Sequence, residues 1–405
     1  MIAQLKRFRS RWWIVTFTAT IIKVLLMFFP PEGDLINWGS IAVTILASFT
    51  SGRYANASIT GVYGGLGLLL VPFAWIWEQL PITHPPVNSY IYFNTSTPVL
   101  LLAFLLKLPT LLADIGTGIL VFRIVNRTTQ SAPKARTAFL VWYLNPYNVY
   151  WVNFFGGMDI IPAFIFMVGL EFAISSKWFR SGIMLAIATI TRIFPLFSVP
   201  YLLLAAQYRR RSTATFLIGF LAPLILGIVV FFAIGSGTLT SIAATPERQY
   251  WLQDFLGYSL TNSYVKLTFV VLALQFFVTY RYWEKKDTIS LSTVSLLVLL
   301  TAAQAYGGST HHFLWVSPLL TTSVMLNPTE RWMFILTFIT GCLAPTIFVP
   351  LPAYTDTLTW GAFWAAKSLY ILRINLNNLT AFNSALNGSP DARGGAIKPI
   401  QIQIP

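Results

Sequence analysis

Long apolar segments, separated by short polar and basic stretches, dominate the chain. A helical crossing of a bilayer needs ~20 mostly apolar residues. The sequence therefore predicts an all-α, polytopic transmembrane helix bundle of about ten to twelve spans. The predicted apolar segments are 12–29, 97–123, 136–154, 160–175, 181–191, 194–207, 214–234, 263–281, 288–306, 313–326, 331–349 and 360–373. Several are shorter than a crossing, and we interpret 181–207 as two half-length helices that meet at Arg192.

The segment 61–80 is apolar enough to cross a membrane, but a crossing there would move the later basic clusters to the opposite side. We interpret it, together with 41–49, as interfacial helices in the first outer loop, a setting that Trp75 and Trp77 suit. The alternative is an ordinary span. We expect one transmembrane domain over residues 1–376 and a polar C-terminal tail over 377–405.

Basic residues gather between alternate apolar segments, and this predicts how the chain is oriented. Cytoplasmic loops are enriched in Lys and Arg, so we expect a cytoplasmic N-terminus in a multi-pass protein of a prokaryotic plasma membrane. The clusters that would then lie inside are Arg123 to Arg136, Lys177 with Arg180, Arg209 to Arg211, Arg281 to Lys286, and Arg331. The net charge of +14 is explained by these clusters, and no nucleic-acid partner is expected.

Composition narrows the class further. Hydrophobic residues make up 56% and charged residues 10% of the chain, which excludes a soluble globular protein. The single cysteine, Cys342, allows neither an intrachain disulfide nor a thiolate metal site. The adjacent His311 and His312 would point about 100° apart on a helix, and no third histidine is near. We therefore expect no metal site and no required cofactor, although a divalent cation is left open.

Three ionisable residues stand where Gly or Pro interrupts the apolar pattern. Asp34 follows the first span, Asp159 lies in the stretch from Gly156 to Pro162, and Arg192 precedes Ile193-Phe194-Pro195. Charges at such places are costly and are functional candidates. The predicted topology puts all three on the outer side, so we expect one external site at the membrane surface. The alternatives are that both aspartates only cap helices and that Arg192 only reaches the interface.

Other polar residues fall on the same predicted side. Candidates for substrate or phosphate contacts are Glu247, Arg248, Tyr250, His311 and His312. Within 97–123, Lys107 and Asp114 are seven residues apart, hence on one helix face, and they are expected to face the bundle interior. Lys107 could meet a phosphate, and Asp114 is expected to brace another helix. Glu171 is expected to pair with Lys177 or Arg180 in a structural role.

The order of these motifs resembles the GT-C superfamily of integral-membrane glycosyltransferases. The resemblance rests on Asp34, on Lys107-x6-Asp114, on Asn145-Pro146 ahead of Gly156-x-x-Asp159-x-x-Pro162, and on Arg192-Ile193-Phe194-Pro195. The late stretch Ser309-Thr310-His311-His312-Phe313-Leu314-Trp315 adds to it. The nearest members are the polyprenyl-phosphate-mannose-dependent mannosyltransferases, including the first mannosyltransferase of GPI-anchor assembly.

This resemblance implies a GT-C-like fold and a reaction. A sugar, mannose by the nearest members, would pass from a polyprenyl-phosphate donor to a hydroxyl of a lipid-linked or glycan acceptor on the non-cytoplasmic face, with inversion. Asp34 would be the general base and Asp159 the second carboxylate. Arg192, with Lys107, Arg248 and His311, would hold the donor phosphate. Contacts to substrate would come from His312, Glu247 and Tyr250.

Two other functions stay open on the sequence. A lipid or solute transporter or flippase would also use broken helices and intramembrane charges, but it needs its polar site near the membrane midplane at a repeat interface. No internal repeat is evident. A non-catalytic scaffold subunit would tolerate alanine at both Asp34 and Asp159.

Overall fold

The computed structural model describes residues 2–29, 35, 38, 39, 41–43, 45–47, 64–84, 97–192, 194–199, 202, 203, 206, 212–234, 314, 315 and 317–326. Every regular element in these ranges is helical. The α-helices are α1 (Ile2–Leu26), α3 (Gly64–Glu78), α4 (Thr97–Thr129), α5 (Ala132–Tyr143), α6 (Pro146–Asn148), α7 (Ile160–Ile174), α8 (Trp178–Thr191), α10 (Ser212–Ile234) and α16 (Ser317–Leu326). A π-helical turn, η3 (Val149–Phe154), and a 3-10 turn, η4 (Phe194–Ser198), complete the set. The prediction of an all-helical bundle is confirmed for the described chain.

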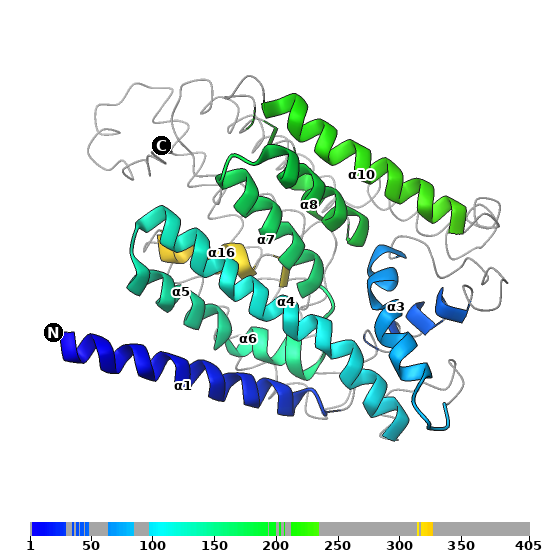
Figure 1. The fold of residues 1–405 in the computed structure, drawn as a ribbon, viewed down its shortest axis with the longest axis horizontal. Coiled ribbons are helices and arrows are strands. Elements are labelled where there is room, and N and C mark those ends of the chain that lie inside the picture. The colour runs from blue at the N-terminus through cyan, green and yellow to red at the C-terminus, as the bar shows by residue number, and fades with distance from the viewer. Residues whose placement is uncertain are drawn as a thin grey trace, which may run out of the picture.

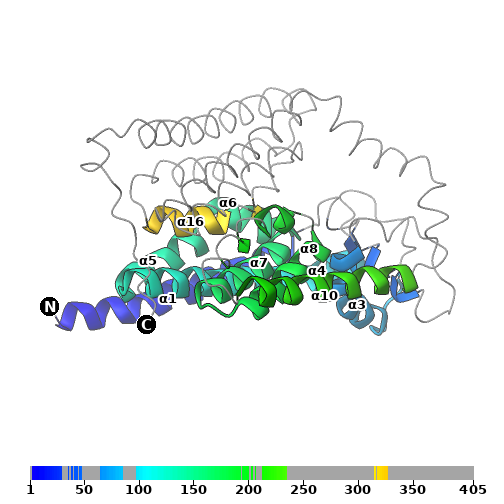
Figure 2. The ribbon, with the colours of Figure 1, turned by 90° about the horizontal axis from the view of Figure 1, so that it is seen from above.

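The 33-residue helix α4 lies at the centre of the described bundle. It packs against α5 on one side and against α7 on the other, and α8 and α10 continue the series beyond α7 (Figure 1). Helix α3 contacts α4 and α8, whereas α1 contacts α5 and η3. Seen from above, α6 and α16 lie on one side of the layer that these helices form (Figure 2). The order of packing therefore follows the order of the chain closely.

Among the described helices, α4 and α10 contain an apolar stretch long enough to cross a bilayer. Helix α10 leaves large apolar side chains such as Ile218 and Leu226 exposed, and α1 does the same with Trp13 and Phe17. A soluble protein rarely exposes broad apolar faces of this kind, whereas lipid contact requires them. The described helices thus form part of a helical membrane protein.

Helices α8 and α10 approach each other through glycines. A Cβ atom on Gly182 of α8 would lie 2.4 Å from the carbonyl oxygen of Phe216, and one on Gly219 of α10 would lie 2.3 Å from that of Phe179. Small residues at helix contacts let backbones come close together in membrane proteins. This close contact fixes α8, the helix that delivers Arg192.

One predicted element is wrong in detail. The predicted single span 136–154 is divided into α5, α6 and η3, because Asn145-Pro146 interrupts it. The side chain of Asn145 accepts a hydrogen bond from the backbone N–H of Tyr147 at 3.0 Å, so it caps α6, whose first residue is Pro146. The predicted break at Arg192 is confirmed, since α8 ends at Thr191 and Arg192 is extended, with φ −155° and ψ 138°.

Helix α3 corresponds to the segment that was interpreted as interfacial. Its 15 residues reach about 22 Å, less than a bilayer core of about 30 Å. Trp75 is half exposed, but Trp77 is buried and donates a hydrogen bond to the carbonyl of Pro98 at 3.0 Å. Trp77 is therefore packed against α4 inside the protein, and the interfacial placement of α3 stays a prediction. The spans predicted at 263–281, 288–306, 331–349 and 360–373, and the tail, lie outside the described residues.

Candidate functional site

Asp159 and Arg192 meet in a buried ion pair. The Nε–H of Arg192 donates to Oδ1 of Asp159 at 2.8 Å, and the two side chains are 10% and 2% exposed, respectively. Taking both charges out of water is costly unless they are paired and hydrogen-bonded. Ionisable side chains buried within the helices of a membrane protein are functional-site candidates by default.

The ends of two adjacent helices bring the pair together. Asp159 precedes the first residue of α7, and Arg192 follows the last residue of α8. Residues 175–177 connect the two helices, which pack against each other, so the start of α7 lies beside the end of α8. Asp159 occupies the N-cap position of α7, but its side chain makes no capping hydrogen bond. Its side chain pairs with Arg192 instead, which argues against the alternative that Asp159 only caps a helix.

The segment that follows α1 contributes an aromatic side chain to this pair. The ring of Trp38 lies under the guanidinium of Arg192, with 5.3 Å between Cζ and the ring centroid, a cation-π distance. Leu35, three residues earlier in the chain, is buried against the Gly156 turn, where a Cβ on Gly156 would lie 2.8 Å from Leu35 Cδ2. Asp34 itself lies outside the described residues, but the residue after it in the chain contacts the Asp159 turn.

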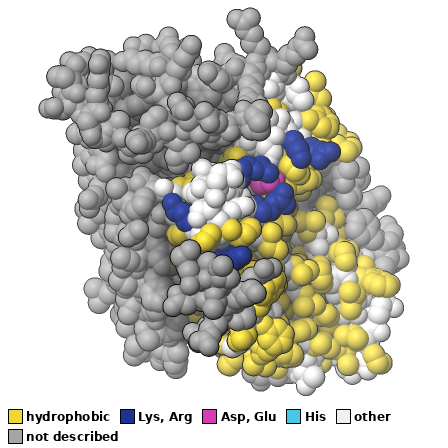
Figure 3. All heavy atoms as spheres, turned by 60° about the vertical axis from the view of Figure 1, so that its left-hand side comes forward, with side chains coloured by type: hydrophobic (Ala, Val, Ile, Leu, Met, Phe, Trp, Pro, Cys, Tyr) yellow, Lys and Arg dark blue, Asp and Glu magenta, His cyan; other side chains and the backbone are white. Residues whose placement is uncertain are grey.

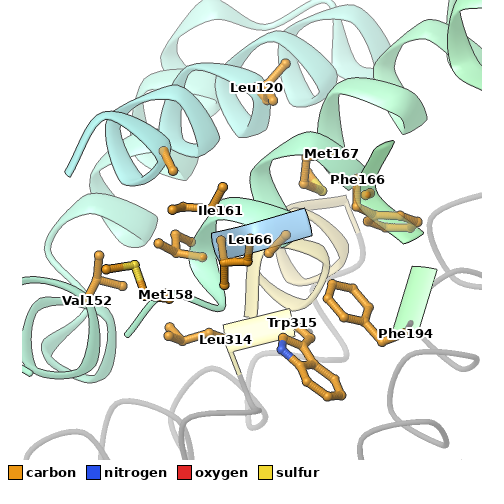
Figure 4. Packing of buried hydrophobic residues seen from close by; sticks show 14 of the residues in the cluster. Leu66, Leu120, Val152, Met158, Ile161, Phe166, Met167, Phe194, Leu314 and Trp315 are labelled. Carbon is orange, nitrogen blue, oxygen red and sulfur yellow. The ribbon is translucent and has the colours of Figure 1, made fainter. Parts of the chain in front are cut away.

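The late motif, the stretch 309–315, also contributes described residues that pack near the Asp159–Arg192 pair. The rings of Phe194 and Trp315 stack with centroids 4.6 Å apart, and Figure 4 shows them side by side, with Leu314 toward Met158. A Cβ on Gly157 would lie 2.9 Å from Leu314 Cδ1 and 2.7 Å from the backbone carbonyl oxygen of Trp151, and this second contact favours glycine at the position. Described residues from the segment after α1, the Asp159 turn, the Arg192 break and the late motif thus pack together. The predicted meeting of Asp159 with Arg192 is confirmed, and the convergence of the other site residues stays a prediction.

Lys107 lies at the edge of the same region. Its ammonium donates to the carbonyl oxygens of Phe29 at 3.1 Å and Phe154 at 2.5 Å, and the side chain is fully buried. These contacts favour a role in holding the chain over direct contact with a phosphate. The prediction that Lys107 and Asp114 face the bundle interior is confirmed, because both are fully buried.

Asp114 belongs to a separate buried network. Lys23 of α1 forms an ion pair with Asp114 of α4 and lies over the ring of Tyr143, 3.6 Å from its centroid. The backbone carbonyl of Asp114 also accepts a hydrogen bond from Trp142 Nε1 at 3.1 Å. Asp114 thus braces another helix, as predicted. Sequence reasoning did not single out Lys23, although a lysine within the apolar run of α1 is itself an intramembrane charge and was the available signal.

At the other end of α7, Glu171 pairs with arginines of α4. Its Oε1 accepts from Arg123 at 3.0 Å and lies 3.3 Å from Arg127. The predicted partners, Lys177 and Arg180, are therefore wrong: α4 lies beside α7 and its last turns pass over Glu171. Figure 3 shows lysine and arginine side chains gathered around a small acidic spot, next to a broad apolar surface. The basic end of the bundle is thus opposite to the Asp159–Arg192 pair.

The remaining predicted site residues cannot be placed. Glu247, Arg248, Tyr250, His311 and His312 lie outside the described residues, as Asp34 does. Trp38 was missed by sequence reasoning, and its position four residues after Asp34 gave only a weak signal. Chemically, the described site offers a buried carboxylate, a guanidinium suited to phosphate, and an aromatic wall.

Comparison with known proteins assigns this arrangement to a family. Residues 83–305, just over half of the chain, match the family model of Glycosyltransferase family 87. The matched range contains Lys107, Asp159 and Arg192, whereas Asp34 and the late motif lie beyond it. No curated protein and no solved structure matches the chain. Because the match covers more than half of the chain, this protein belongs to Glycosyltransferase family 87, and it is a helical membrane glycosyltransferase of the GT-C type.

Proposed function

We propose that this glycosyltransferase uses a polyprenyl-phosphate sugar, with mannose as the sugar, and transfers it with inversion to a hydroxyl of a lipid-linked or glycan acceptor. The observation that carries the proposal is the buried Asp159–Arg192 pair at a point where four segments converge. A lipid donor is accessible to a site within apolar helices, and its phosphate needs a cationic partner there. Arg192 meets that need.

The proposed reaction assigns one role to each charged group. Asp34 accepts the proton of the acceptor hydroxyl as its oxygen attacks the anomeric carbon, and the bond from that carbon to the phosphate oxygen breaks. The polyprenyl phosphate leaves with the bonding electrons, and Arg192 stabilises the charge that develops on it. Asp159 holds the guanidinium through Nε and so orients it toward the phosphate. A positioned guanidinium suffices for a monophosphate leaving group, so the proposed reaction requires no metal.

The architecture supports an external location for this site. Helix α7 begins directly after Asp159, and Glu171 with its two arginines lies near its other end, so one helix separates the proposed site from the basic end. Lysines and arginines accumulate on the cytoplasmic side of membrane proteins. We therefore place the Asp159–Arg192 pair at the non-cytoplasmic face of a plasma membrane of prokaryotic type.

The remaining contacts are proposed from the sequence. Arg248 and His311 would assist Arg192 at the phosphate, and Glu247, Tyr250 and His312 would contact the sugar or the acceptor. Support for the late motif comes from its neighbours in the chain, since Leu314 and Trp315 pack against Gly157 and Phe194.

The contacts within the bundle weaken the transporter alternative. That alternative depended on Lys107 and Asp114 as intramembrane charges along a transport path. In the structure, Asp114 forms an ion pair with Lys23, and the Lys107 ammonium donates hydrogen bonds to two backbone carbonyls. Both charges thus hold helices and turns together. Family membership also indicates sugar transfer rather than transport.

The decisive experiment compares the parent protein with Asp34→Asn in proteoliposomes that contain radiolabelled polyprenyl-phosphate mannose and a glycolipid acceptor. We expect transfer to fall by at least about 100-fold in the variant, because a general base contributes roughly 10²–10⁴-fold. Equal transfer by the two proteins would remove Asp34 as the base. Transfer from a nucleotide sugar, with none from the polyprenyl-phosphate donor, would overturn the proposed donor class.

A further inference from the structure

Lys107 is hydrogen-bonded to the chain shortly before each of the two proposed catalytic carboxylates. Its ammonium bonds the carbonyl oxygen of Phe29, five residues before Asp34, and that of Phe154, five residues before Asp159. The two bonded residues are far apart in the sequence, and no helix connects them directly. One buried side chain thus contacts the chain at Phe29 and at Phe154, shortly before each proposed carboxylate.

The aliphatic part of the Lys107 side chain packs close to Gly156, which also lies close to Leu35. Gly156, in the Asp159 turn, has φ +82°, and a Cβ there would lie 3.1 Å from both Cγ and Cε of Lys107 and 2.8 Å from Leu35 Cδ2. Leu35 is the residue directly after Asp34. Phe29 and Leu35, the described residues on either side of 30–34, therefore contact Lys107 and Gly156, respectively.

The environment explains why a lysine is needed. Phe29 follows the last residues of α1, and Phe154 is the last residue of η3, so both carbonyls lie at or near helix ends, where backbone acceptors lack helical partners. Within apolar surroundings an unsatisfied carbonyl is costly. A cationic donor on a long unbranched side chain satisfies both carbonyl oxygens. It can do so only while Phe29 and Phe154 stay close together.

We propose that Lys107 is a positioning residue that holds together the segment that leads from Phe29 toward Asp34 and the segment that leads from Phe154 to Asp159, and so sets the geometry of the active site. The assignment rests on the proposed function for the roles of those carboxylates, but this clasp of the two segments by Lys107 is itself a property of the fold. It replaces the prediction that Lys107 contacts the donor phosphate. A positioning residue acts on the rate of chemistry, whereas a phosphate ligand also acts on the binding of the donor.

The test uses the full-length protein in detergent or nanodiscs, with Lys107→Met as the main variant, because methionine keeps an unbranched stem and removes the ammonium. Hydrogen exchange is measured in peptides that cover residues 28–36 and 153–160. We expect exchange in both regions to become about tenfold faster together, since two charge-assisted hydrogen bonds are lost. Arg123→Met, the same kind of change at the far end of α4, is the matched control and should alter neither region.

Kinetics supply the second readout. For Lys107→Met we expect kcat to fall about 100-fold, while the KM for polyprenyl-phosphate mannose changes less than about threefold. Lys107→Arg, which keeps a cationic donor, should recover part of the lost kcat. If exchange in both regions is unchanged and binding of a labelled polyprenyl phosphate weakens instead, Lys107 is a phosphate ligand and the clasp is wrong.

A second perturbation protects the test against misfolding of Lys107→Met. Gly156→Ala leaves Lys107 in place but puts a methyl group between Lys107 and Leu35 at a backbone conformation that disfavours alanine. It should loosen the same two regions, and unchanged exchange in them would contradict the clasp. If the parent transfers no sugar from any polyprenyl-phosphate donor, the proposed function fails, and the exchange measurements still decide whether the clasp exists.

Discussion

The two ends of helix α7 carry the same chemistry in different surroundings. At its start, Asp159 and Arg192 are both buried, and their side chains are 2% and 10% exposed. Near its end, Glu171 is buried at 6%, but its partners Arg123 and Arg127 are 55% and 44% exposed. A carboxylate with solvated arginines is an ordinary structural pair, whereas two charges buried together are costly. The difference indicates that the start of α7 is the functional end.

The largest effect should follow from Arg192→Met. The change leaves the Asp159 carboxylate buried without this cation, which costs about 3–5 kcal/mol of stability in comparable buried pairs. It also removes the proposed phosphate ligand, so sugar transfer should be lost. Thermal unfolding in detergent and the radiolabelled transfer assay measure the two effects. Stability and transfer both equal to those of the parent would show that the two ends of α7 do not differ.

Asp159→Asn should have a smaller effect on folding than on activity. The amide oxygen can still accept the hydrogen bond from Arg192 Nε, so the fold should persist. The guanidinium loses its charged partner and its fixed orientation, and we expect kcat to fall about 100-fold. Steady-state kinetics with polyprenyl-phosphate mannose provide the test. A variant with unchanged kcat and a raised acceptor KM would instead assign Asp159 to the acceptor.

Glu171→Gln should have a modest effect on stability alone. The amide oxygen still accepts from Arg123, and both arginines keep access to water, so the expected cost is about 1 kcal/mol. Transfer activity should match that of the parent, because Glu171 lies at the opposite end of α7 from Asp159. The same unfolding and transfer assays apply. A loss of transfer with normal stability would mean that the basic end also takes part in the reaction.

The smallest effect is expected for Arg123→Met. Exposed ion pairs contribute about 0.2–1 kcal/mol, and Arg127 remains beside Glu171. Added salt should weaken the Glu171 pair and leave the Asp159–Arg192 pair nearly unchanged, because salt screens exposed charges more than buried ones. Unfolding curves of the parent and this variant at low and high ionic strength test both expectations. Equal salt sensitivity would contradict the assigned difference in burial.

Much of the fold could be predicted because it depends on local patterns. For most of the ends of α4, α7 and α10, the apolar segments predicted the position to within a few residues. The prolines and glycines predicted the break at Arg192. The division of 136–154 was missed, because the apolar pattern continues through Asn145-Pro146 while the backbone does not. The motif order also predicted the family class that the comparison confirms.

The sequence by itself determined that this is a helical membrane glycosyltransferase and that Asp159 and Arg192 interrupt its apolar pattern. Only the tertiary structure decided which cation meets which carboxylate. The paired residues are 33 positions apart for Asp159 and Arg192, 48 for Arg123 and Glu171, and 91 for Lys23 and Asp114. Hydropathy depends on each residue and its near neighbours, whereas an ion pair depends on how helices pack. The partners of Glu171 were therefore mispredicted, and Lys23 and Trp38 were found only in the folded chain.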